Sequence, residues 1–171
     1  LYSSAASDVY KRQVHVHMTN TSNLPVEALE NEYPLLMDEY AMIPDSGGVG
    51  RTRGGLAIAK QIRAVGPGIV FSARSDSHTV GVAAGVDGGG DGRRARLIRN
   101  FGTPQAEELF SKTANIALAP GDSVRIETPG GGGYGAPAER IRTRIERDLA
   151  DGKVSAEAAL AAYGAAPATP R

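Results

Sequence analysis

The chain has 171 residues, 41% of them hydrophobic, so its size and composition correspond to a single globular domain that can bury a core. Its 19 basic residues balance 19 acidic ones, which argues against nucleic acid or an anionic membrane surface as a partner. Without cysteine, it has no disulfide, no thiolate metal site and no cysteine nucleophile. No apolar run approaches the roughly 18 residues of a membrane span, so we expect a soluble, cytoplasmic protein.

Residues 1–13 differ from the rest of the chain. They start without Met and lack the apolar region of a secretory signal. Their sequence resembles the translated read-through of a sequencing adapter, so we expect this segment to carry no biological information and to be poorly ordered. We then expect the protein-specific sequence to begin near Val14, part-way along a longer protein.

Residues 14–18 alternate between apolar and polar side chains, which predicts a short strand with His15 and His17 on one face. Two histidines at this spacing can face the same metal ion. The other interpretation is the exposed polar face of an edge strand. We favour the exposed face, because no third ligand lies nearby in the sequence.

Prolines and glycines divide the next part of the chain into short elements. A helix of at most two turns is predicted after Asn23, which is a possible N-cap. Residues 35–43, bounded by a proline on each side, are predicted to form a strand. After a glycine-rich loop, the apolar alternation at 56–65 and 69–75 predicts a β-hairpin around a Gly-Pro-Gly turn.

The second half of the chain begins with residues 81–92, which hold six glycines and are predicted to form a surface loop. Further strands are predicted at 94–99, 112–118 and 123–128, with a Pro- and Gly-containing turn between the last two.

Two helices are predicted at the end of the chain. Ile141, Ile145 and Leu149 recur every four residues, which marks one face of a helix that ends near Gly152. A second helix is predicted to run from its N-cap, Ser155, to Gly164.

These elements predict an α+β fold. A strand-rich body of hairpins and Gly-rich loops is expected over residues 14–135, and a two-helix tail over 136–171.

The glycine run at 130–135 satisfies the pattern G-x-G-x-x-G of dinucleotide-binding sites. Such a site needs a second parallel strand after the helix, with an acidic residue at its end, whereas a second short helix follows here. We therefore interpret the run as consecutive turns with positive φ, through which the last strand leads into the C-terminal helices.

Arg51 and Arg53 lie in the glycine-rich loop at 45–55, where guanidinium groups could bind a carboxylate or phosphate. The alternative is that both arginines are simply solvated. The sequence contains no Walker lysine, no H-E-x-x-H and no G-x-S-x-G motif.

Three motifs, in this order, resemble the hydantoinase B/5-oxoprolinase family: MTNTSNLPVEALE at 18–30, DSGGVGRTRGG at 45–55 and TPGGGGYG at 128–135. The closing segments at 151–155 and 163–164 fit the same family. The resemblance extends over roughly residues 14–164.

This resemblance implies that the chain is the C-terminal part of a longer subunit that forms a heteromeric complex with a hydantoinase A-type ATP-binding subunit or domain. Such enzymes open cyclic amides, for example 5-oxoproline or hydantoins, by coupling hydrolysis to ATP cleavage. Phosphorylation of the amide oxygen would make the C–N bond one that water can break. The resemblance places ATP on the partner and a divalent metal, with His and Asp ligands upstream, in the full-length subunit. We expect no cofactor on these residues alone, which should be inactive without the rest of the enzyme.

Seven residues in or beside these motifs are candidates for a position near the substrate or the subunit contact. They are Asn20, Asn23, Glu27, Asp45, Ser46, Arg51 and Arg53. The alternative role for all seven is to shape their loops. If Arg53 serves the site, the substitution Arg53→Ala should lower ATP-coupled ring opening with little loss of thermal stability.

Two other functions stay open at this point. Subunits of ketone carboxylases, which act on acetone or acetophenone, resemble the same family and share its fold. A non-catalytic interaction module, whose exposed strands dock a partner, is the other alternative.

Overall fold

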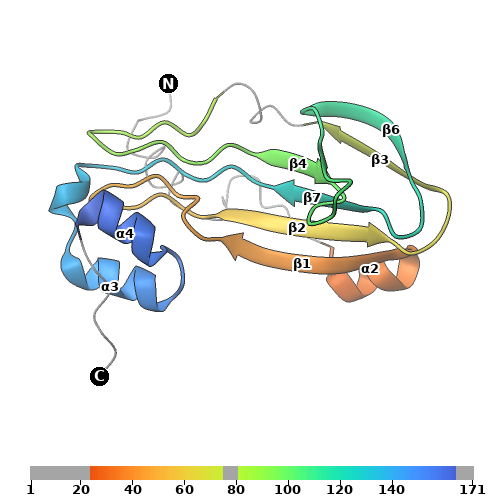
Figure 1. The fold of residues 1–171 in the computed structure, drawn as a ribbon, viewed down its shortest axis with the longest axis horizontal. Helices are drawn as coiled ribbons and strands as arrows, with labels where there is room; N and C mark the ends of the chain where they lie inside the picture. The colour runs from red at the N-terminus through yellow and green to blue at the C-terminus, as the bar shows by residue number, and fades with distance from the viewer. Residues whose placement is uncertain (1–23, 75–80, 165–171) are drawn as a thin grey trace.

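The structure of the protein, a computed structural model, describes residues 24–74 and 81–164. The elements follow in the order α2 (Val26–Glu32), β1 (Leu35–Ile43), β2 (Ala57–Ala64), β3 (Ile69–Arg74), β4 (Arg96–Arg99), β5 (Glu107–Glu108), β6 (Lys112–Leu118), β7 (Ser123–Glu127), the 3-10 turn η1 (Pro137–Glu139), α3 (Arg142–Ala150) and α4 (Ala156–Tyr163) (Figure 1). The predicted α+β class is confirmed. Among the described helices, none is both long and apolar enough to cross a membrane.

The strands form two antiparallel sheets, a five-stranded sheet in the order β1-β2-β7-β4-β5 and a two-stranded ribbon of β3 and β6 (Figure 1). The predicted hairpin of 56–65 with 69–75 is therefore wrong. Both edges of β2 are already paired, with β1 on one side and β7 on the other, so β3 cannot add to it. The turn at 66–68 instead carries the chain out of the sheet, and β3 pairs with β6.

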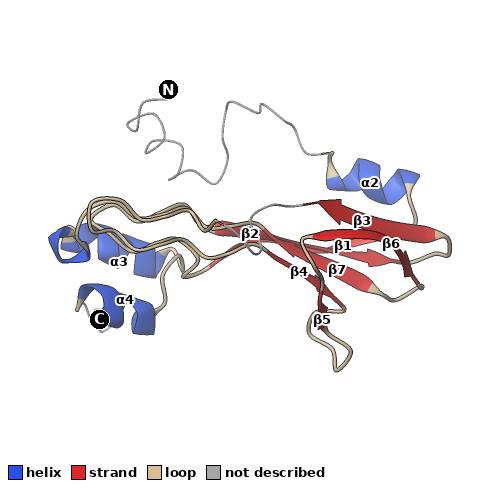
Figure 2. Ribbon diagram, turned by 90° about the horizontal axis from the view of Figure 1, so that it is seen from above, coloured by secondary structure: helices blue, strands red, loops and turns tan. Residues whose placement is uncertain are grey.

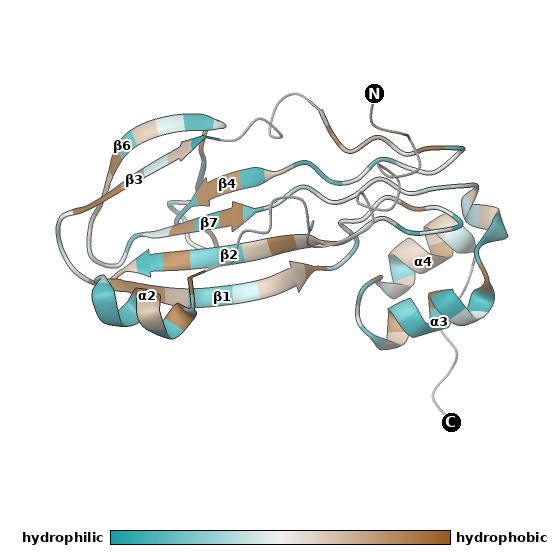
Figure 3. Ribbon diagram, turned by 180° about the vertical axis from the view of Figure 1, so that it is seen from behind, coloured by the Kyte–Doolittle hydropathy of each residue, from teal (hydrophilic) through white to brown (hydrophobic). Residues whose placement is uncertain are grey.

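The ribbon packs on one face of the sheet and forms the main apolar core with it. Buried Leu97 and Val124 of the sheet contact Ile69 and Phe71 of β3. Successive side chains along β3 alternate between the inner and outer faces of the ribbon, and Ile69 and Phe71 lie on the inner face. Figure 3 shows the apolar colouring of β7 and part of β2, in contrast to the hydrophilic α3. The alternating pattern thus predicts which face is buried, although not which strand pairs with which.

Three extended, glycine-rich segments run side by side from the sheet towards α3 and α4 (Figures 1 and 2). They comprise residues 46–55, 83–92 and 130–135, and we call them the glycine layer. Backbone hydrogen bonds join all three, from Gly48 N to Gly131 O at 2.8 Å, from Gly90 N to Val49 O at 2.7 Å and from Gly133 N to Gly90 O at 2.9 Å. The predicted surface loop at 81–92 is therefore correct only in part, because much of it belongs to this layer.

The backbones in the glycine layer lie too close together for side chains. A Cβ atom added to Gly130 would lie 1.8 Å from the carbonyl oxygen of Ser46, and one added to Gly54 would lie 1.9 Å from that of Gly131. Real Cβ atoms essentially never come within 3.0 Å of such a neighbouring heavy atom. Glycine is required here because only hydrogen fits.

This close approach corrects the interpretation of the glycine run at 130–135 as consecutive turns with positive φ. Within the run, only Gly135 has a positive φ, of 73°. The other glycines of the run do not have a positive φ. Glycine is needed at these positions because another backbone segment lies close by in space, which the local sequence does not reveal.

Replacing Gly130 by alanine should therefore be strongly destabilising. We expect Gly130→Ala to lower the free energy of unfolding by about 3 kcal/mol or more, because Cβ and a main-chain oxygen cannot both keep their positions. The matched control is Gly102→Ala, where φ is 81° but no atom lies within 4 Å of the added Cβ. Its expected loss is only about 1 kcal/mol. Equal losses in denaturant unfolding would contradict the steric explanation.

Candidate functional site

The two C-terminal helices lie against the end of the glycine layer (Figures 1 and 2). They contact each other through Ile145, Val154 and Ala159, which are buried. The predicted caps of α4 are confirmed, since the Ser155 hydroxyl accepts a hydrogen bond from the Ala158 backbone and Gly164 is left-handed with φ 63°. The predicted cap of α2 is wrong, because its N-cap residue is Pro25 rather than Asn23 and no side chain caps it. The helices α3 and α4 therefore form a small unit with its own apolar core.

A buried carboxylate joins this unit to the glycine layer. Asp148 of α3 accepts hydrogen bonds from Nε and Nη2 of Arg53 at 3.0 and 3.3 Å, and from Nη2 of Arg140 at 2.5 Å. The exposed fractions of these side chains are 10% for Asp148, 14% for Arg53 and 6% for Arg140. Two guanidinium groups thus compensate one desolvated carboxylate, the arrangement that a buried charge needs.

Tyr163 of α4 lies beside this cluster. The guanidinium of Arg140 is 5.5 Å from the centre of its ring, within the range of a cation–π contact. Burial raises the pKa of the Tyr163 hydroxyl, and the nearby charge of Arg140 opposes that effect. The phenol therefore stays neutral at physiological pH.

Asp45 and Ser46 also serve this junction. A carboxylate oxygen of Asp45 accepts the Ser155 N–H at 2.8 Å, and the Asp45 N–H donates to the carbonyl of Lys153 at 3.2 Å. The Ser46 hydroxyl donates to the carbonyl of Ile43 at 2.5 Å and accepts the Ala57 N–H at 2.7 Å. Because Ser46 is only 1% exposed and bonded on both sides, it is poorly suited to act as a nucleophile.

Arg51 is a sequence-predicted residue with an accessible polar group in this region. Its side chain is 47% exposed, it lies 3.4 Å from a carboxylate oxygen of Glu139, and its guanidinium stacks 5.3 Å from the centre of the Tyr134 ring. The backbone of the rigid glycine layer holds it in place, since Arg51 N donates to Gly135 O at 3.1 Å.

The structure brings four of the seven candidates together, namely Asp45, Ser46, Arg51 and Arg53, around the glycine layer. Glu27 lies apart from them, exposed in the first turn of α2 at the opposite end of the molecule (Figure 1). The remaining candidates lie outside the described residues, as do the two histidines considered as metal ligands. These are Asn20, Asn23, His15 and His17.

Sequence reasoning missed Asp148, Arg140 and Tyr163. A signal for Asp148 was present, because it lies three residues after Ile145 and next to Leu149, on the apolar stripe of its helix. A carboxylate on a buried face needs a cationic partner. The sequence could not show that Arg53, 95 positions away, supplies it.

A second ionic cluster lies on the sheet, where β7 leads into the glycine layer. The Glu127 carboxylate, only 4% exposed, accepts hydrogen bonds from Arg93 at 2.9 Å and from Arg125 at 2.8 Å. Arg125 also pairs with Glu39 of the edge strand β1. All of these charges are compensated within the sheet, so the cluster joins β1, β7 and the start of β4.

The described residues do not fit a metal centre. Over 24–74 and 81–164, no three His, Cys, Asp or Glu side chains come close enough together to hold an ion. The metal that the family implies would need ligands from other residues. We therefore assign the described residues no role in metal chemistry.

Comparison with known proteins identifies the family. The sequence model described as "Hydantoinase B/oxoprolinase" matches residues 4–137, well over half of the chain. The chain therefore belongs to the hydantoinase B/oxoprolinase family. The match begins inside the segment 1–13, and the interpretation of that segment as adapter read-through stays a prediction. The predicted division between a strand-rich body, which ends at residue 135, and a helical tail, which begins at residue 136, also stays a prediction.

Three similar proteins illustrate this family. The B-type subunit of a putative D-/L-hydantoinase from Pseudomonas sp. (strain NS671) is 34% identical over 146 residues, 85% of this chain and 24% of that protein. The crystal structure of an ATP-dependent caprolactamase from Pseudomonas jessenii is similar with a TM-score of 0.66 at 26% identity, over 84% of this chain and 25% of that chain. A nucleotide-free acetone carboxylase structure gives a TM-score of 0.70 at 19% identity, over 84% and 23%, a likeness of fold alone.

The chain thus spans about a quarter of the length of these proteins. The names of two of them, a hydantoinase and a caprolactamase, refer to cyclic amides, and the first is one subunit of its enzyme.

The buried ion pair contradicts the expectation that Arg53→Ala leaves stability nearly unchanged. Removing Arg53 leaves the Asp148 carboxylate with Arg140 alone, so the free energy of unfolding should fall by about 3 kcal/mol. The matched control is Arg147→Ala, also an arginine paired with an aspartate, because the Arg147 side chain is 82% exposed and 3.9 Å from its partner. Little change is expected there. If thermal unfolding of Arg53→Ala coincides with that of the control, the ion pair does not hold the helices.

Proposed function

We propose that this chain is the C-terminal part of an ATP-dependent cyclic amidohydrolase. The enzyme opens lactam or hydantoin rings together with a hydantoinase A-type ATP-binding partner. The observation that carries this proposal is the similarity to the caprolactamase, at 26% identity over 84% of this chain, because the name of that enzyme states both ATP dependence and a lactam substrate. The similarity to the B-type subunit of a hydantoinase supports the same class of substrate and a complex of subunits.

Within this enzyme the described residues have a supporting role. They contain no cluster that could hold a metal, and the Ser46 hydroxyl is enclosed, so water activation falls to residues elsewhere in the full-length subunit. ATP lies on the partner, a divalent metal in the full-length subunit, and the complex is cytoplasmic. The glycine layer provides a rigid backbone, and substrate-positioning groups are more effective when a rigid element carries them.

Arg51 is the group in the described region best placed for such a role. It is half exposed, and its neighbours Tyr134 and Glu139 fix its orientation. A guanidinium held in this way can bind the carboxylate or phosphorylated form of a substrate, or an acidic group of the partner. Asp45, Ser46 and Arg53 contribute by holding the layer and the helices in place.

A ketone carboxylase is the alternative with the same fold. The acetone carboxylase has the higher TM-score, but its 19% identity is below that of the caprolactamase and supports the fold alone. A non-catalytic interaction module differs from both, because it would support no turnover in any complex.

The test is to produce the full-length subunit that contains this chain together with its hydantoinase A-type partner. ADP release and product formation should be measured with 5-oxoproline, hydantoin and caprolactam, and with acetone plus bicarbonate. We expect ADP release coupled to ring opening for at least one cyclic amide, and none when either subunit is omitted. Turnover of acetone and bicarbonate without any ring opening would contradict this proposal and favour the ketone carboxylase. The absence of turnover with every substrate would favour the non-catalytic interaction module.

In that complex, Arg51→Ala should lower kcat/KM for the cyclic amide by about tenfold or more, the loss expected for one charge-assisted hydrogen bond. The matched control is Arg142→Ala, an arginine of α3 whose side chain is 70% exposed and paired with Glu146. Both variants should unfold at nearly the wild-type temperature. Equal kcat/KM values for Arg51→Ala and the wild type would exclude Arg51 from the site.

A further inference from the structure

A cleft lies between strand β3 of the ribbon and the face of the five-stranded sheet. Its volume is about 290 Å³, and three segments line it, residues 71–74 of β3, Ala95 and Leu97 at β4, and residues 126–129 at the end of β7. This volume is at the lower end of the range for ligand pockets, so the cleft suits a small molecule.

The inner walls of the cleft are apolar. Leu97 is only 2% exposed and belongs to the main core, while Phe71, Ala73 and Ile126 pack against that core. The cleft therefore extends the apolar interior of the protein towards solvent. An aliphatic group that enters it is removed from water, and this transfer favours binding.

The mouth of the cleft is polar, because the exposed residues Ser72, Arg74 and Thr128 line it. The Ser72 hydroxyl accepts the Asn115 N–H at 3.0 Å, and the Thr128 hydroxyl accepts the Ile58 N–H at 2.8 Å. A hydroxyl that accepts from the main chain still has its own O–H to donate. Both hydroxyl groups are therefore available as donors to a ligand.

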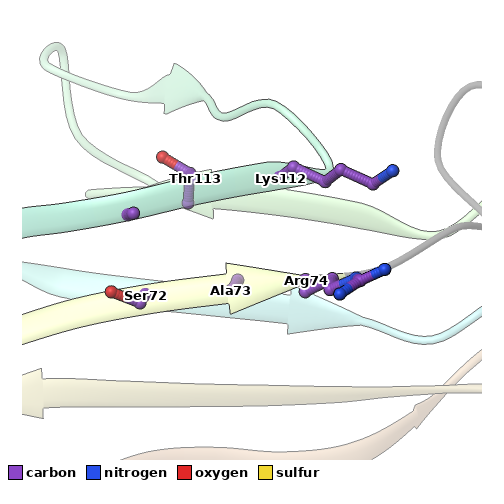
Figure 4. Close-up of a pocket in the computed structure, with 6 residues that line it drawn as sticks. Ser72, Ala73, Arg74, Lys112 and Thr113 are labelled. Carbon is purple, nitrogen blue, oxygen red and sulfur yellow. The ribbon is translucent and has the colours of Figure 1, made fainter.

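Arg74 places a positive charge at this mouth. Among the described residues, no carboxylate pairs with Arg74 and no side-chain hydrogen bond holds it, whereas Arg99 in the sheet pairs with Asp122 at 2.6 Å. Figure 4 is centred on a neighbouring hollow that shares Arg74 with the cleft, and it shows the Arg74 side chain extending past the end of β3. The Arg74 guanidinium can therefore bind an added anion.

Glu127 also lines the cleft, but its negative charge is already compensated. Its carboxylate is buried, and its two oxygens accept hydrogen bonds from Arg93 at 2.9 Å and from Arg125 at 2.8 Å. Glu127 therefore neither excludes an anion nor offers an oxygen to a cationic ligand. The charge that the cleft presents to a ligand is that of Arg74.

We propose that this cleft binds a short aliphatic carboxylate of about four to six carbon atoms. The hydrocarbon chain packs between Phe71 and Leu97, and the carboxylate pairs with the Arg74 guanidinium through two parallel N–H donors. The Ser72 hydroxyl is a further donor to the carboxylate. A small inorganic anion lacks the apolar part of this ligand and an aliphatic alcohol lacks its charge, so each can use only half of the site.

The site is separate from Arg51 and from the proposed ring opening, so the 171-residue chain can be tested without a partner. The measurement is an NMR titration of the ¹⁵N-labelled chain with sodium acetate, butanoate and hexanoate at constant pH and ionic strength. For hexanoate we expect saturable shifts at the amides of 71–74, 95–97 and 126–128, with a dissociation constant in the millimolar range. Affinity should rise by about threefold for each CH₂ group that enters the cleft.

Two comparisons test the apolar and the charged half of the site separately. Acetate should bind far more weakly than hexanoate, and 1-hexanol should bind several-fold more weakly. Equal affinity for acetate and hexanoate would reduce the contact to an ion pair at the surface. Equal affinity for 1-hexanol and hexanoate would leave an apolar crevice without a role for Arg74. Either result, or the absence of saturable binding, overturns the proposal.

The decisive variant is Arg74→Gln, which removes the charge at an exposed position and should leave the fold intact. It should weaken hexanoate binding by about fivefold or more, while the binding of 1-hexanol stays within about twofold of the wild type.

The matched control is Arg144→Gln, which makes the same change in net charge at an exposed arginine of α3, at the other end of the molecule (Figure 1). Hexanoate binding to the control should stay within about twofold of the wild type, because screening limits the influence of distant charges. Equal weakening of hexanoate binding by both variants would overturn the assignment of Arg74, and shifts spread throughout the chain would overturn the assignment of the cleft.

Discussion

The structure depends on close contact between main-chain segments at positions where glycine leaves no side chain between them. In the glycine layer, the carbonyl oxygen of Ser46 accepts the Arg93 N–H at 2.9 Å and also occupies the space that a Cβ of Gly130 would fill. Main-chain groups that are buried in this layer must each find a partner in a neighbouring segment. Collagen uses the same principle, since only glycine fits where its chains meet. The layer gains rigidity from hydrogen bonds rather than from side-chain packing.

A layer built largely from glycine offers little apolar surface for a helix to bury. This explains why the C-terminal helices keep their apolar contacts between themselves and attach to the layer through charge. Asp148 reaches Arg53 in the layer, and Asp45 holds the backbone of Ser155 at the start of α4. Buried ion pairs contribute less to stability than apolar packing of similar volume, but they define one geometry, because a misplaced partner leaves a charge uncompensated. Here that geometry fixes the orientation of the two helices on the layer.

The sequence was a good guide where structure depends on neighbouring residues. The prolines at 34 and 44 bound β1, and Ser155 and Gly164 bound α4, because caps and breakers act within one turn of the chain. The sequence was a poor guide where distant segments meet. The pairing of β3 with β6 rather than β2 follows from β7 occupying the edge of β2, about 60 residues later in the chain. The glycine run was misinterpreted for the same reason, since its constraint comes from Ser46 and Val49 rather than from its own φ angles. Asp45, Ser46 and Arg53 lie in one motif of the sequence, but their bonds to Ser155, Ala57 and Asp148 could not be foreseen.

The similarity of this fold to both a caprolactamase and an acetone carboxylase has a consequence for where specificity resides. A fold that serves two reactions does not decide between them, so the chemistry must depend on individual side chains and on segments beyond the shared body. The close-packed glycines of the layer cannot vary without steric conflict, and the buried ions of the helix junction cannot vary without leaving a charge unpaired. Among the candidate residues in this region, Arg51 is free of both constraints, because its side chain is half exposed and packs on Tyr134 and Glu139 at the surface. Differences in function between members of this family should therefore appear at exposed positions carried by the layer, while the layer itself stays the same.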